Sequence, residues 1–225
     1  MDEIAQLIDQ RAGPYGEVAL RRRGQQFEII ANGCFLMDSS DGRSERLLVS
    51  SAVEMFGQPE GASLLIAGLG IGFSLAEASS DLRLGRICVV ERERAIIDWH
   101  TCGNAPLRPL AGTGHTDQRT RVVHDDLLHH LATRDDRYDV VCLDIDNGPD
   151  WTVTEDNQEV YEPRGLDLLE QALTERGVLS VWSAAPAPDF TRRLESRFSR
   201  VETLEIPLLP GRRSEPDVVI LASRA

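Results

Sequence analysis

The chain has 225 residues, of which 41% are hydrophobic and 27% charged, and its formal net charge at pH 7 is −13. Such a charge disfavours nucleic acid as a partner, because neutralised phosphates supply most of the non-specific affinity for it. The charge suits a cationic small substrate, and it equally suits solubility alone. No apolar run approaches the ~20 residues that cross a bilayer, and residues 1–3 lack the basic segment of a signal peptide. We therefore expect a cytoplasmic protein that does not associate with membranes.

The cysteine and lysine content excludes several kinds of functional site. The four cysteines, Cys34, Cys88, Cys102 and Cys142, are scattered and form no C-x-x-C motif. We therefore expect neither a metal site nor a disulfide framework. All 24 basic residues counted as lysine or arginine are arginine, which excludes a Schiff base on lysine and a P-loop.

The N-terminal segment predicts a small separate unit. Residues 2–11 place Ile4, Leu7 and Ile8 on one helical face, which predicts a short amphipathic helix. Strand-like runs follow from residue 16 to residue 37, and they are separated by the hairpin turns at residues 23–24 and 32–33. We predict an N-terminal helix and antiparallel β-hairpin subdomain over residues 1–43. It would serve as a lid or as a dimerisation element, and the second role suggests a homodimer.

The remainder, residues 44–225, alternates strands with helices. After a helix over residues 45–56, we expect strands at 64–67, 86–91, 119–123, 138–143 and 177–182, helices at 73–79, 93–101, 127–133, 164–174 and 188–196, and closing strands near 200–206 and 216–222. This alternation predicts an α/β fold with a doubly wound, mostly parallel, Rossmann-like sheet. Ligands of such sheets bind beyond the carboxyl ends of the strands.

A glycine-rich turn follows the first of these strands. Gly68, Gly70 and Gly72 remove Cβ atoms where the backbone bends and where a ligand approaches, although such turns also occur for purely steric reasons. The helix that opens after the turn presents free N–H groups to a polar ligand. In a dinucleotide-binding G-x-G-x-x-G motif the third glycine would fall on Phe73. The observed spacing therefore fits adenosyl-sulfonium donors better than NAD.

Acidic residues end the next three strands. Glu91 stands 23 residues after Gly68, which suits an acid that binds ribose hydroxyls, and the alternative is a solvated carboxylate. Asp125 and Asp126 follow the third strand, where either could instead cap the helix at residue 127. Asp144 directly ends a buried strand and precedes a turn that would aim its carboxylate into the cleft.

With these features the chain resembles the spermidine synthase family. Its members are aminopropyltransferases that have the class I methyltransferase fold and an N-terminal β-hairpin unit. The resemblance covers most of the chain. Its pieces are the glycine turn, Glu91, residues 122–127, the strand from Tyr138 to Asp144, and residues 176–179 before a strand. It implies that the co-substrate is S-adenosylmethionine or decarboxylated S-adenosylmethionine.

The resemblance also implies roles by position. Gly68, Gly70 and Gly72 would line the aminoacyl or aminopropyl arm of the sulfonium, and Glu91 would bind the ribose. Asp126, with Asp125 beside it, would bind the adenine. Asp144 matches the first acid of the family's D-S-S-D-P loop, and this match makes it the base that accepts a proton from the attacking amine.

Three positions depart from the family. Ile71 replaces the acid that holds the cationic arm of the decarboxylated donor, Asn147 replaces the second acid of the D-S-S-D-P loop, and Ser51-Ala52 replaces a Tyr-His pair that helps to hold the polyamine. Burying an ammonium group without carboxylate partners is unfavourable, so putrescine is not the expected acceptor. S-adenosylmethionine keeps its own carboxylate and would not need an acid at residue 71.

The long loop after residue 143 supplies the remaining candidates. Asp146, Asn147, Trp151 and Tyr161 are the predicted substrate-facing side chains, with lid packing as the alternative for the two aromatic residues. We hypothesise a transferase that moves a methyl or aminopropyl group from the sulfonium donor to a small polar acceptor. The alternative is a non-catalytic nucleoside-binding or interaction protein derived from this family.

Overall fold

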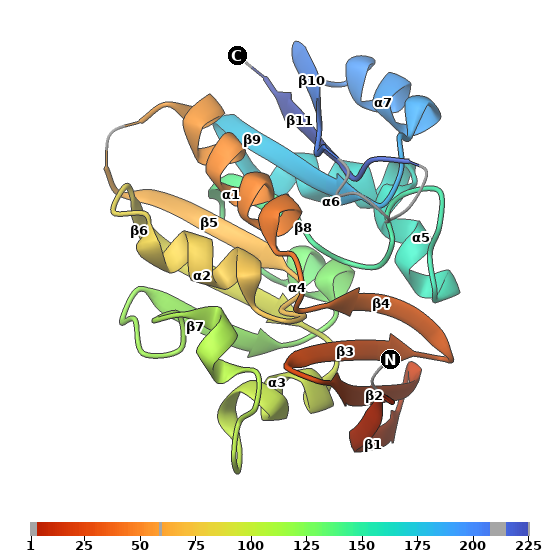
Figure 1. Cartoon of the computed structure of the whole chain (residues 1–225). Coiled ribbons are helices and arrows are strands. Elements are labelled where there is room, and N and C mark those ends of the chain that lie inside the picture. Colours follow the sequence, from red (N-terminus) through yellow and green to blue (C-terminus); the bar gives the residue numbers. More distant parts are fainter. Residues whose placement is uncertain (1–3, 59, 208–214, 225) are drawn as a thin grey trace.

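The computed structural model describes residues 4–58, 60–207 and 215–224. Within these residues a seven-stranded sheet carries most of the fold (Figure 1). Its strands are β5 (Ala62–Ala67), β6 (Leu84–Glu91), β7 (Thr120–His124), β8 (Tyr138–Leu143), β9 (Leu173–Ser183), β10 (Arg200–Glu205) and β11 (Val218–Ser223). They lie in the order β10-β11-β9-β8-β5-β6-β7, and all pairs are parallel except those made by β11. The predicted doubly wound, mostly parallel sheet is confirmed.

Helices cover both faces of this sheet, because the strands carry apolar side chains on both sides. The helices are α1 (Arg43–Phe56), α2 (Phe73–Ser80), α3 (Arg94–Thr101), α4 (Leu127–Thr133), α5 (Glu155–Tyr161), α6 (Pro163–Ala172) and α7 (Pro188–Glu195). Along β5, Leu64 and Ile66 pack in the cluster that includes α1 and α2, whereas Leu65 and Ala67 pack in the cluster that includes α4, α6 and α7. Among the described residues no helix is both long and apolar enough to cross a bilayer.

The chain order places a crevice between β5 and β8. From β5 the chain continues to β6 and β7 on one side, and it then returns to β8 on the other side of β5. At this reversal the connections leave the two strands in opposite directions, so a ligand-sized space opens beyond their carboxyl ends. The N–H of Asp144 donates to the carbonyl of Ala67 at 2.8 Å, which ties the two strand ends together.

The N-terminal unit is a four-stranded antiparallel sheet of β1 (Gln6–Gly13), β2 (Gly16–Arg23), β3 (Gln26–Ala31) and β4 (Cys34–Asp38). The predicted helix over residues 2–11 is wrong; residues 2 and 3 lie outside the described residues, and residues 6–13 pair with β2. The side chains of Ile4, Leu7 and Ile8 are 93%, 52% and 43% exposed. An apolar helical face at these positions would therefore gain no burial that stabilises a helix. Pairing with β2 therefore decides the conformation of this short segment.

Polar contacts fix the small sheet to the main body. The indole N–H of Trp99 on α3 donates to the carboxylate of Asp9 at 2.9 Å, and Arg11 pairs with Asp98 at 2.6 Å. The sheet begins to join the main core at β2, where Leu20 packs in the same cluster as α1. Figure 1 shows it beside the carboxyl ends of β5 and β6. The division at residues 43 and 44 stays a prediction, and the first helix starts at residue 43.

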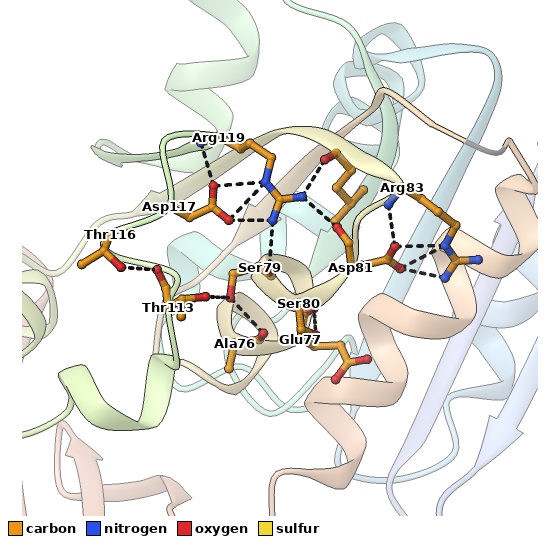
Figure 2. Close-up of polar contacts among 11 residues, drawn as sticks. Ala76, Glu77, Ser79, Ser80, Asp81, Arg83, Thr113, Thr116, Asp117 and Arg119 are labelled. Atoms are coloured by element: carbon orange, nitrogen blue, oxygen red, sulfur yellow. Dashed lines mark hydrogen bonds and ion pairs between the residues drawn. The ribbon is translucent and has the colours of Figure 1, made fainter.

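At the opposite, amino-terminal end of the sheet, Arg119 holds three elements together (Figure 2). Its guanidinium donates to the carbonyls of Ser79 at 2.6 Å and of Asp81 and Leu84 at 2.8 Å each. It also pairs with the carboxylate of Asp117 at 2.6 Å. These bonds join the end of α2 to the start of β6 and to the segment before β7. They therefore stabilise the amino-terminal end of the sheet.

Candidate functional site

A cavity of about 400 Å³ lies at the carboxyl ends of β5, β6 and β8. Strands β2, β3 and β4 of the small sheet and the first turn of α1 form its other walls. Its volume falls within the ~300–1,000 Å³ typical of small-molecule sites. The cavity occupies the place at which the strand order predicts a ligand.

The predicted glycine turn borders this cavity, but its three glycines differ in what they contact. Gly68 and Gly70 line the cavity, and Gly68 has a φ of +95°. A Cβ on Gly68 would lie 2.2 Å from the carbonyl oxygen of Asp144, so only glycine permits this approach. Gly72 does not line the cavity; a Cβ there would lie 2.8 Å from Cε1 of His100. The steric interpretation therefore accounts for Gly72.

Glu91 is enclosed beside the turn and is only 5% exposed. Its two carboxylate oxygens accept the N–H of Leu69 at 2.9 Å and the N–H of Glu93 at 2.7 Å. Burial raises the pKa of Glu91, and these backbone donors oppose the rise. The solvated-carboxylate alternative is therefore wrong. Glu91 fixes the conformation of the glycine turn and also forms part of the cavity wall.

Asp125 and Asp126 both line the cavity and also organise the start of α4. Asp126 is the N-cap of α4, since its carboxylate accepts the N–H of His129 at 3.0 Å. Asp125 contacts Nδ1 of the same histidine at 2.8 Å. The capping interpretation is confirmed for Asp126. The role of either residue in binding adenine stays a prediction.

Asp144 stands at the floor of the cavity, directly after β8. One of its carboxylate oxygens accepts a hydrogen bond from the hydroxyl of Ser74, on α2, at 2.6 Å. Its enclosed position raises the pKa of Asp144, the Ser74 hydroxyl opposes this effect, and the nearby Glu91 carboxylate adds to it. A carboxyl group with a raised pKa in a cleft is suited to accept a proton near neutral pH.

Glu45 was not among the predicted site residues, although it lies on the same cavity wall. It belongs to the first turn of α1 and is 6% exposed. Burial and the charge of Asp144 raise its pKa, while the hydroxyl of Ser44, which donates to its carboxylate at 2.8 Å, lowers it. In sequence the only signal was an acid at the start of a helix, and such an acid is usually solvated.

Of the four loop residues predicted to face the substrate, only Asp146 lines the cavity. Its φ is +59°, and its carboxylate accepts the N–H of Val153 and a side-chain N–H of Asn157, each at 2.7 Å. These bonds shape the loop that leads into α5, so the predicted long loop after residue 143 contains a helix. Asp146 therefore both shapes this loop and contributes a carboxylate to the cavity wall.

The other three loop residues lie elsewhere. Tyr161 is 1% exposed on α5, and its hydroxyl donates to the carbonyl of Ile145 at 3.2 Å, so it supports the loop from behind. Asn147 is 2% exposed, and its side chain has no hydrogen-bond partner within the described part of the chain. Trp151 is 54% exposed. The side chain of Ile71, at the position of the missing family acid, is fully buried in the core.

The cavity wall is strongly acidic. Two arginines also line it: Arg43 pairs with Asp41 at 3.0 Å, whereas Arg92 donates to the neutral hydroxyl of Thr154 at 2.7 Å and keeps its charge. The carboxyl side chains of the wall are Glu17, Asp38, Asp41, Glu45, Glu91, Glu93, Asp125, Asp126, Asp144, Asp146 and Asp217. This excess of negative charge favours a cationic ligand.

The fold has well-matched counterparts among solved structures. A spermidine synthase in complex with the transition-state analogue AdoDATO matches with a TM-score of 0.79 and 17% sequence identity, over 98% of this chain and 74% of that one. The spermidine synthase of Thermotoga maritima matches with a TM-score of 0.77 and 15% identity, over 98% and 73% of the two chains. No family model and no curated protein matches the sequence. The chain therefore has a spermidine synthase-like fold, as its sequence motifs predict.

Proposed function

We propose that this protein is an adenosyl-sulfonium-dependent alkyl transferase. The observation that carries the proposal is the meeting, in one cavity, of the turn at Gly68, the carboxylate of Glu91 and the carboxyl group of Asp144. The fold supports it, because a spermidine synthase of the same fold was solved with AdoDATO, a transition-state analogue. The nucleoside of the donor would lie against Gly68, Gly70, Glu91 and the Asp125-Asp126 pair.

The reaction would be a direct displacement. The amine nitrogen of the acceptor first gives a proton to the carboxylate of Asp144, and its lone pair then forms a bond to the carbon next to the sulfonium. The carbon–sulfur bond breaks with its electron pair on sulfur, which leaves as a neutral thioether and needs no acid. Alignment of nitrogen, carbon and sulfur in the cavity supplies most of the acceleration.

We favour decarboxylated S-adenosylmethionine as the donor and a small amine as the acceptor. Both are cations and suit the eleven carboxyl groups of the wall. S-adenosylmethionine carries an additional carboxylate, which the same acidic wall would repel. The buried Ile71 favours a second candidate, methyl transfer from S-adenosylmethionine, since this residue provides no acid for an aminopropyl arm.

Isothermal titration calorimetry tests the proposal. We expect methylthioadenosine and decarboxylated S-adenosylmethionine to bind, and S-adenosylmethionine to bind at least about tenfold more weakly than the decarboxylated donor. A preference for S-adenosylmethionine would favour methyl transfer. Failure of all three to bind would refute an adenosyl-sulfonium site, and binding without turnover of any amine would favour the non-catalytic alternative.

A further inference from the structure

The hydroxyl of Ser74 contacts both the carboxylate of Asp144 and the backbone of Glu45. The Oγ of Ser74 donates to Oδ2 of Asp144 at 2.6 Å and lies 3.4 Å from the backbone carbonyl of Glu45. Glu45 comes from the first turn of α1 and Asp144 from the end of β8, so the two acids approach from distant parts of the sequence. Both residues line the same cavity, and the charge of Asp144 contributes to the raised pKa of Glu45.

No cation neutralises this pair within the described part of the chain. Among the described residues, the side-chain partners of Glu45 and Asp144 are the hydroxyls of Ser44 and Ser74, and neither acid forms an ion pair. Two arginines lie close to Glu45 in sequence: the guanidinium of Arg46 stacks on the ring of Phe73 at 4.8 Å, and that of Arg43 contacts the carboxylate of Asp41 and the carbonyl of Pro207. Asp217 adds a further negative charge, which also raises the pKa of Glu45. Enclosed carboxyl groups without a cation are unfavourable, so a bound cation would be stabilised there.

A second feature of the same wall also lacks a partner. Trp182 lines the cavity at the end of β9, and β8 and β9 pair in a register that sets Leu143 opposite Val181. Trp182 is therefore the neighbour of Asp144 on the adjacent strand. Its indole N–H is buried and has no hydrogen-bond partner among the described residues. A ligand or an ordered water that reaches the pair would also satisfy this donor.

We propose that Glu45 is a specificity-determining residue that binds the ammonium group of the acceptor together with Asp144. The inference rests on the proposed function and adds a residue to it. In the loop after Asp144, the carboxylate of Asp146 accepts the N–H of Val153 and a side-chain N–H of Asn157. Asn147 is buried away from the cavity lining. Glu45 supplies the second carboxyl group from α1 instead.

The test compares Glu45→Gln with Glu54→Gln. Glu54 is an exposed residue of the same helix and does not line the cavity, so it is the matched control. Calorimetry measures the binding of methylthioadenosine to each variant and then the binding of butylamine and putrescine to the nucleoside complex. We expect Glu45→Gln to weaken amine binding about tenfold or more and to leave nucleoside binding within about twofold. Glu54→Gln should change neither.

The outcomes separate the inference from the proposed function. If the wild type binds methylthioadenosine but neither amine, or if Glu45→Gln binds the amines as tightly as the wild type, the role of Glu45 is refuted while the nucleoside site stands. If the wild type does not bind methylthioadenosine, the proposed function itself fails. Retained nucleoside binding by Glu45→Gln shows that this variant is folded. Glu45→Asp, which keeps the charge on a shorter side chain, should recover part of the amine affinity.

Discussion

Replacement of Gly68 by alanine tests how closely the glycine turn and Asp144 depend on each other. A non-glycine residue at the φ of +95° is strained by about 1–2 kcal/mol. The added Cβ would also lie 2.2 Å from the carbonyl oxygen and 3.0 Å from the carbonyl carbon of Asp144, and both are backbone atoms that cannot rotate away. Relieving such an overlap in a packed core adds about 1–3 kcal/mol. We therefore expect a total destabilisation of roughly 2–5 kcal/mol.

Scanning calorimetry and amine turnover measure the two consequences. For a chain of this length each 1 kcal/mol lowers Tm by about 2–4 °C, so Gly68→Ala should lower it by roughly 4–20 °C. Because the overlap displaces the backbone of Asp144, we also expect a loss of turnover of about 10²-fold per ångström of displacement.

Gly61→Ala is the matched control for this variant. Gly61 precedes β5, has a φ of +81°, and has no described atom within 4 Å of its Cβ position, so it reports the conformational strain alone. If Tm falls by the same amount in both variants, the overlap with Asp144 adds nothing to the conformational strain. If Gly68→Ala retains full turnover, the close approach of Gly68 to Asp144 has no functional consequence. Either result would refute the reasoning.

Three further predictions concern Asp144, Glu45 and Arg119. Asp144→Asn should lower kcat by about 10²–10⁴-fold and leave methylthioadenosine binding unchanged in calorimetry, because only the proton acceptor is lost; unchanged kcat would remove the general-base role. The raised pKa values of Asp144 and Glu45 mean that these groups stabilise the fold at acidic pH and that this contribution is lost as pH rises through the raised values. Urea unfolding should therefore show stability falling between about pH 4 and pH 8, and falling less in Glu45→Gln; equal slopes would contradict the pairing of the two acids. Arg119→Lys should destabilise the protein by about 2–3 kcal/mol in the same assay, since lysine cannot make the fork of bonds to three carbonyls. Arg83→Lys, at a half-exposed pair with Asp81 (Figure 2), should change stability by less than about 1 kcal/mol, and equal effects would contradict the role of Arg119.

Patterns confined to one segment were read correctly from the sequence. The apolar run before Gly68 and the runs before Glu91 and Asp144 are buried strands, because an uninterrupted apolar segment of this length has few other stable conformations. The turn at Asn32 and Gly33 has positive φ at both residues, as its sequence predicts. Dimerisation and the cytoplasmic location remain predictions.

Residues whose position depends on distant partners were not predictable. Tyr161 was expected to face a substrate, yet α5 turns its side chain into the core, and the polar sequence of that short helix gave no period to detect. The segment that begins with Ile4 fits a helical pattern as well as a strand pattern, and it forms a strand because it pairs with β2.

The amino-acid sequence alone was enough to predict the α/β class, the alternation of strands and helices, and the acids that end the strands, because a buried strand is identified by the apolar residues within it. The set of side chains that share the cavity depends on how the elements pack and required the three-dimensional structure. That packing brought Glu45 from α1 to Asp144 and turned Asn147 away, because the distance between two residues depends on the packing of whole elements and is not encoded in either segment alone.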